Sequence, residues 1–208
     1  MASIMFNTQI NNLYQIWQES LIGGAVIVVC ALVGWLAGNV HDRWAVRVVK
    51  WWLDHIVYRV VISRSWLKRT VMIAVNNSLI CLCPPLLGKL DYIAWLAIAC
   101  IGFCLGVALR LMIKETPAVR DDEEKIISSN TKSPIIGMLL NLLEIPAIML
   151  CAGLGLSQGA MTSTIDLPSA LHIYCLFALP MFIIGASGES LWMGCDPNIS
   201  KLWTHKHK

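Results

Sequence analysis

The residues with the clearest capacity for chemistry lie inside one apolar segment, residues 134–159. Near its middle this segment carries Asn141, Glu144 and Pro146. A carboxylate in hydrocarbon costs roughly 2–3 kcal/mol or more unless it is protonated or paired, and a proline removes one helix hydrogen bond. A membrane span tolerates such residues only where other helices surround them. The segment is therefore predicted to be the inner helix of a small bundle.

Glu144 lies about ten residues into this span, roughly 15 Å deep and close to the bilayer midplane. Asn76 and Asn77, in an earlier apolar segment, lie at a comparable depth. Two interpretations are open. In the first, Glu144 and the asparagines form a buried polar cluster that transmits protons, binds an ion or orders the bundle. In the second, Glu144 is neutral and its hydrogen bonds to asparagine serve only to hold helices together. Pro146 is predicted to kink its helix beside this cluster.

The composition of the chain indicates which elements hold these residues. Of its 208 residues 57% are hydrophobic and 14% are charged, and its mean hydropathy is +0.65, too apolar for a soluble domain of this size. The expected fold class is an all-α polytopic membrane protein, a single-domain bundle of about five transmembrane helices plus an amphipathic interfacial helix. Glu189 follows the last span and is expected to cap a turn or to pair with Arg110. The predicted segments are a polar tail at 1–20, spans at 21–40, 70–87, 92–113, 135–157 and 170–187, and a cytoplasmic loop at 115–133.

Residues 43–62 are predicted to form the interfacial helix. Arg43, Arg47, Lys50 and Asp54 follow helical spacing and form one stripe, while tryptophans lie elsewhere on the helix. Apolar bulk beside a basic face is typical of a helix that lies in the membrane surface. The helix is either a linker held by anionic lipid or a docking surface for a soluble partner. The residues expected to contact lipid or a partner are Arg43, Arg47, Lys50, Trp51, Trp52 and Arg59.

The charge distribution predicts the orientation in the cell membrane. With five spans and the N-terminus outside, every lysine and arginine except Lys89 falls on the cytoplasmic side, as does the C-terminus. The positive-inside rule requires such an asymmetry. If residues 44–62 crossed the membrane instead, several charged residues would lie in lipid and the asymmetry would be weaker.

Several classes of function are disfavoured by what the sequence lacks. It has no GxSxG, HExxH, Walker, GxGxxG or CxxC motif, and its one long polar loop is too short for a catalytic domain. The eight cysteines lie mostly in apolar runs without the spacing of a zinc site, and a net charge of +3 does not indicate nucleic-acid binding. We therefore expect no enzymatic activity, no metal, no cofactor and no nucleic-acid partner.

Residues 142–147 (LLEIPA) and 152–156 (AGLGL) resemble the stage II sporulation protein M (SpoIIM) family of integral membrane proteins. That family has a span with a Glu-x-Pro-Ala core followed by a Gly-x-Gly patch. Residues 186–197 (ASGESLWMGCDP) are similar to its closing helix, and the regions around Asn77 and Gly102 resemble its paired middle spans. Leu140 and Asn141 stand where the family usually has His-Gly. The resemblance implies a non-enzymatic membrane component, since in sporulating bacteria the family anchors peptidoglycan-degrading enzymes in a membrane complex.

Three hypotheses for the function follow. The leading one is a non-enzymatic membrane subunit or scaffold that assembles with itself or with other protein subunits, with anionic lipid as a further partner. Its contacts are the basic surface helix and small-residue patches such as the GxxxG of Gly34 and Gly38. The second is a transport or channel subunit in which Glu144 lines a polar path. The third is a membrane sensor component of a defence or secretion system.

Overall fold

Apolar helices of membrane-spanning length make up most of the chain. The computed structural model describes residues 2–38, 44–52, 55, 65–115, 139–158 and 165–195. Five helices in these ranges are long and apolar enough to cross a membrane, and no strand occurs there. The predicted all-α polytopic bundle is therefore confirmed. The five candidate spans are Ile16–Ala37, Trp66–Leu87, Tyr92–Leu111, Leu139–Leu156 and Leu167–Leu191.

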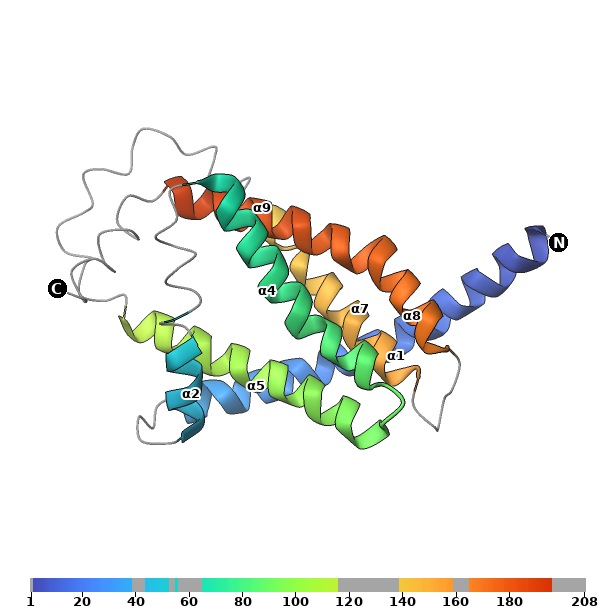
Figure 1. Cartoon of the computed structure of the whole chain (residues 1–208). Helices are drawn as coiled ribbons and strands as arrows, with labels where there is room; N and C mark the ends of the chain where they lie inside the picture. Colours follow the sequence, from blue (N-terminus) through green and yellow to red (C-terminus); the bar gives the residue numbers. More distant parts are fainter. Residues whose placement is uncertain are drawn as a thin grey trace.

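Figure 1 shows how the described helices are arranged, with α2 lying across the end of α5 and the N-terminal part of α1 projecting past the bundle. The elements are α1 (Ala2–Ala37), α2 (Trp44–Trp52), α4 (Trp66–Leu87), α5 (Asp91–Glu115), α7 (Glu144–Leu156), α8 (Leu167–Ile173), the π-helical segment η3 (Tyr174–Ala178) and α9 (Leu179–Cys195).

Glycines on both helices bring α1 and α5 together. Gly34 of α1 packs against the backbone of Phe103, and Gly106 of α5 packs against the backbone of Ala31. Each of these glycines belongs to a GxxxG pair, and a side chain at either position would overlap main-chain atoms of the other helix. Close approach of this kind is what small residues permit in membranes, where helix packing cannot rely on a hydrophobic driving force.

The helix α7 lies at the centre of the bundle, as predicted for the inner helix. It contacts α1, α4 and α9, and its residues 151–156 are all buried. Small residues again allow α7 to approach its neighbouring helices closely. A β-carbon built at Gly23 of α1 would lie 2.6 Å from the Ala152 β-carbon, and one at Gly155 would lie 2.7 Å from the Pro84 carbonyl oxygen. The AGLGL stretch of α7 therefore serves as a packing surface for two neighbouring helices.

The regular helix of the polar segment is interrupted at Leu142 and Leu143, next to the kink that the sequence predicted at Pro146. The amide of Ile145 donates to the carbonyl of Leu142, three residues earlier, at 3.3 Å, and α7 begins at Glu144. Pro146 explains the break, because it has no N–H for the Leu142 carbonyl and its ring would crowd that carbonyl. Glu144 consequently occupies the first turn of a new helix.

Two neighbours of α7 also depart from regular helix geometry. α4 continues through Pro84 and Pro85, both of which are buried. The last span widens into η3 just before Pro180, which has no N–H for a regular helical bond. Irregular backbone at membrane depth is tolerated where protein surrounds it. The three irregular helices contact one another within the bundle.

Several predicted boundaries changed; α4, for example, begins at Trp66 and not at residue 70. α1 is helical from Ala2, so residues 2–20, predicted as a tail, are its first half; no glycine or proline interrupts the chain before Gly23. α2 covers residues 44–52 of the predicted interfacial helix. Apart from His55, the rest of that prediction lies outside the described residues, as does the predicted loop beyond Glu115.

We predict that the exchange Gly34→Leu destabilises the folded bundle by about 1–3 kcal/mol, because the new side chain overpacks the contact between α1 and α5. Thermal or denaturant unfolding in detergent micelles measures this loss. Ala25→Leu, which enlarges an exposed position of the same helix, is the matched control and should leave stability nearly unchanged. Equal stability of the two variants would contradict the packing role of Gly34.

Candidate functional site

A chain of side-chain hydrogen bonds joins α4 to α7 inside the bundle. The Asn77 Nδ2 donates to the Glu144 Oε2 at 2.9 Å, and the Asn76 Nδ2 donates to the Asn77 Oδ1 at 3.1 Å. The structure thus brings together the three polar residues that sequence reasoning placed at one depth. Asn77 acts as both donor and acceptor, and this leaves Glu144 held by a neutral amide.

The surroundings of Glu144 come from α9. Gly185 packs directly against the Glu144 Cγ, so the missing side chain at this position makes room for the carboxyl group. The Oε1 of Glu144 is buried and has no hydrogen-bond partner among the described residues. Glu189, one turn further along α9, interacts electrostatically with Glu144. The cluster therefore contains a second carboxyl group that was predicted to cap a turn or to pair with Arg110.

The helix break also affects the electrostatics of the cluster. Glu144 lies in the first turn of α7, where the dipole of the helix favours negative charge. Asn141 lies before the break and takes no part in the hydrogen-bonded chain. Pro146 is exposed, so it shapes the break and does not line the cluster. Of the five predicted cluster residues, Asn76, Asn77 and Glu144 form the site that the structure describes.

Further polar contacts hold α9 and η3 against α4 on either side of the cluster. The guanidinium of Arg69 donates to the Ser190 Oγ at 3.3 Å and to the Ser190 carbonyl at 3.2 Å. The Tyr174 hydroxyl donates to the Ser78 carbonyl at 3.2 Å. These contacts fix the distance between α4 and α9, and with it the approach of Gly185 to Glu144.

At the far end of the bundle, Gln158 joins the ends of α4 and α7. Its Nε2 donates to the carbonyls of Pro85 at 2.7 Å and of Leu154 at 3.0 Å, and the residue is only 6% exposed. One amide group thereby satisfies the terminal carbonyls of two helices. Sequence reasoning missed this role, because a glutamine near a span end carries no signal of which backbone it meets.

The second candidate surface is the outer face of α2, which consists of Trp44, Arg47, Val48, Lys50 and Trp51. The opposite face of α2 is anchored: Val46 and Val49, at 2% and 4% exposure, pack in one cluster with α5 residues that include Val107. On the outer face the exposed fractions of Trp44 and Trp51 are 74% and 59%, and Arg47 and Lys50 are also exposed.

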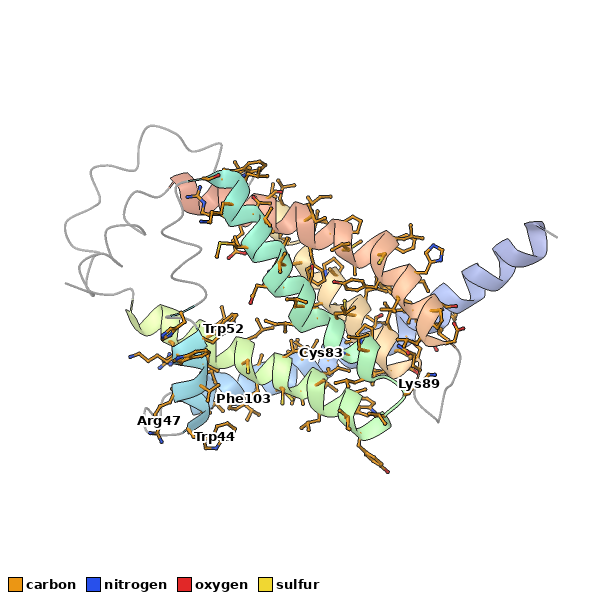
Figure 2. All side chains as sticks on the ribbon, in the orientation of Figure 1. Trp44, Arg47, Trp52, Cys83, Lys89 and Phe103 are labelled. Carbon is orange, nitrogen blue, oxygen red and sulfur yellow. The ribbon has the colours of Figure 1, made fainter. Side chains whose placement is uncertain are left out.

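The predicted contact residues of the interfacial helix divide between these two faces. Trp52 was predicted as a contact residue, but it is partly buried and packs with Phe103 against the α5 cluster (Figure 2). It is rotated about 100° from Trp51 on the helix, so one tryptophan anchors α2 while the other is exposed. The ring of His55 stacks on Trp51 with centroids 4.8 Å apart. Arg43 and Arg59 lie outside the described residues.

Within the described residues no group of three or more His, Cys, Asp or Glu is placed to hold a metal ion. Comparison with known proteins adds no relative, because no family model, curated protein or solved structure matches the chain. Fold and site together define a polytopic all-α membrane protein with a polar cluster within its spans.

We predict that Asn77→Leu lowers the free energy of unfolding by about 0.5–1.5 kcal/mol, because it leaves the carboxyl group of Glu144 without its donor. Glu144→Gln should retain most of the stability, since a glutamine oxygen still accepts from Asn77. In a double-mutant cycle with Glu144→Leu, denaturant unfolding in micelles should give a coupling energy of the same size. Additive effects of the two leucine exchanges would contradict the described hydrogen bond.

Proposed function

We propose that this chain is a non-enzymatic integral membrane subunit that assembles in a multi-protein membrane complex and docks its partners through the outer face of α2. The single observation that carries the proposal is the anchoring of α2 by Val46 and Val49, which leaves Trp44, Trp51 and the basic residues of the helix exposed. A rigidly held helix with an exposed apolar and basic face is suited to contacts beyond its own chain.

The composition of the outer face favours a membrane surface with anionic lipid as the first partner. Trp44 and Trp51 are side chains typical of the headgroup region, and Arg47 and Lys50 lie beside them on the helix. Lipid contact on the tryptophan side leaves the basic side available to an acidic protein segment. Either a second copy of the chain or another protein subunit would then meet the bundle at this end.

The proposed orientation has the N-terminus outside and the C-terminus in the cytoplasm. In support, Figure 2 shows Arg47 and Lys89 at opposite ends of the bundle. Lys68 and Arg69 start α4 at the end that faces Ser190, while Lys89 follows the other end of α4. The Lys89 end also carries Asp166, whose pKa is held below its usual value by hydrogen bonds from Ser169 and by Lys89. The end poorer in cations is assigned to the outside.

We expect the double exchange Arg47→Glu and Lys50→Glu to release protein partners while the chain remains in the membrane fraction, because both side chains are exposed and outside the packed core. Quantitative mass spectrometry after purification in a mild detergent measures the partners retained. Lys68→Glu with Lys89→Glu, which changes net charge equally at other exposed positions, is the matched control. Identical partner sets for the two double variants would contradict docking at α2.

A second candidate function, transport of protons or cations, is favoured by one specific observation. Two carboxyl groups, Glu144 and Glu189, interact within the spans at an interrupted helix, and one oxygen of Glu144 is buried without a hydrogen-bond partner in the described residues. Ionisable residues at membrane depth commonly mark ion or proton pathways, and broken helices commonly accompany them.

For this second candidate, Glu144→Gln should abolish proton uptake into proteoliposomes driven by a potassium diffusion potential, since a glutamine cannot release a proton. A pH-sensitive dye inside the vesicles reports the uptake. Glu19→Gln, which removes a carboxyl group of α1 outside the cluster, should leave it unchanged. Transport would be excluded if wild-type vesicles took up protons no faster than protein-free vesicles, or if Glu144→Gln had no effect.

A further inference from the structure

The unpartnered oxygen of Glu144 faces α9. A β-carbon built at Gly185 would lie 3.1 Å from the Glu144 Oε1, which is buried and accepts no hydrogen bond from the described residues. Glu189 follows Gly185 by four residues, so it lies on the same face of α9, about 6 Å further along the helix axis. The two carboxyl groups also interact electrostatically. Glu189 is therefore placed to exchange a proton with this oxygen.

Glu189 lies between Glu144 and the start of α4. The Ser190 Oγ donates to the Trp66 carbonyl at 3.1 Å, and Glu189 directly precedes Ser190 in the chain. Glu144 meets Asn77, which is about three turns further along α4. We call the end of the bundle where α4 starts the Trp66 end, and the opposite one the Lys89 end. From Glu144, the second carboxyl group thus leads toward the Trp66 end.

A further unpartnered polar group lies at the level of Glu189. Thr70 is 5% exposed, and its Oγ1 has no hydrogen-bond partner among the described residues. It lies one turn beyond Trp66, and one turn before Ala74, which packs in one cluster with Ala186 of α9. Thr70 is seven residues before Asn77, so both share one face of α4. A hydroxyl can donate and accept hydrogen bonds at once, as a proton route requires.

Toward the Lys89 end the interior of the bundle is mainly apolar. Its side chains form one buried cluster that includes Cys81, Cys151, Leu154 and Phe182, each at most 4% exposed. Cys81 also interacts electrostatically with Glu144, but a buried thiol in such surroundings behaves as a small hydrophobe. Glu144 consequently has polar neighbours toward one end of the bundle and an apolar seal toward the other.

We infer that Glu189 relays protons between Glu144 and the Trp66 end, along a route lined by the Thr70 hydroxyl, and that Glu144 exchanges protons with that end alone while the apolar cluster stays packed. The inference rests on the proposed transport function, since it assigns the access route of the same acid. In each step the O–H bond of Glu189 breaks and one forms at the Glu144 Oε1. Glu189 is left as a carboxylate until the Trp66 end, where Arg69 is bonded to Ser190, returns a proton.

Proton uptake into proteoliposomes, driven by a potassium diffusion potential, tests the relay. Glu189→Gln should slow uptake by at least about tenfold, since a glutamine of the same size cannot pass on a proton. Glu189→Asp keeps the acid and should restore much of the rate. The matched control is Ser187→Ala, which removes a hydroxyl of α9 that donates to the Ile183 carbonyl of its own helix, and it should match the wild type.

The side of access is measured with dicyclohexylcarbodiimide, which enters from the lipid and reacts with protonated carboxyl groups. The reagent is applied to sealed vesicles of each orientation, with the pH set separately on the two sides. Mass spectrometry then reports the modified fraction of Glu144. This fraction should fall when the pH is raised on the Trp66 side, and stay constant when it is raised on the Lys89 side.

Uptake at the wild-type rate in Glu189→Gln would overturn the relay and leave transport standing. A wild type no faster than protein-free vesicles would exclude both. Equal losses in Glu189→Gln and Glu189→Asp would indicate a structural role and contradict the relay. Where Glu189→Gln fails to fold, Thr70→Val, which keeps the shape and removes the hydroxyl, should still slow uptake severalfold, and wild-type uptake in it would overturn the route.

The labelling gives an answer that does not depend on uptake. Modification of Glu144 that follows the pH on the Lys89 side, that follows both sides equally, or that is absent at every pH would overturn access from the Trp66 end. Modification that follows the Trp66 side alone supports it, even in vesicles whose lack of uptake excludes transport.

Discussion

A carboxyl group within the apolar thickness of a membrane needs a partner, and the hydrogen bond from Asn77 to Glu144 meets that need here. Much of the bundle is arranged around it. α4 supplies the donor, α7 supplies the acid, and α9 approaches with a glycine where any side chain would collide with the acid. The contacts of Arg69 and Tyr174 hold α9 at that distance. The same groups bear both on packing between helices and on the proposed proton or cation transport, so activity and stability have to be measured separately.

The irregular helices follow from the same constraint. Pro146 interrupts the inner span, and the new helix therefore starts at Glu144, where its dipole favours the acid. Pro84 and Pro85 have no N–H for the carbonyls of Ile80 and Cys81, and at the end of α4 Gln158 supplies an amide to the carbonyl of Pro85. Glycines on α1, α5 and α7 then allow the backbones to approach closely enough to enclose these irregular segments. Polar and small residues thus determine the packing, while the abundant leucine and valine mainly face outward.

Hydropathy and residue counting were sufficient to predict the spans and to place Asn77 and Glu144 at one level, because both measure position along the membrane normal. They do not measure rotation about a helix axis. Sequence reasoning therefore missed that Gly185 and Glu189 face Glu144, and it assigned Trp52 to the contact surface although Trp52 packs against α5. It also began the first helix too late, since a polar stretch without glycine or proline gives no signal of where a helix begins. The function could not be predicted in the same way, and comparison with known proteins finds no relative from which to infer it.

The depth of Glu144 depends on α4 crossing the membrane with its cation-rich start on one side and Lys89 on the other. Native lysines allow a direct test without mutation: a membrane-impermeant amine reagent applied to sealed vesicles of each orientation, followed by mass spectrometry of the modified peptides. The account predicts that Lys89 reacts from one face only, and that Lys50 and Lys68 react only from the opposite face. Modification of all three lysines from the same face would contradict the five-span arrangement and the sheltered position of Glu144 that depends on it.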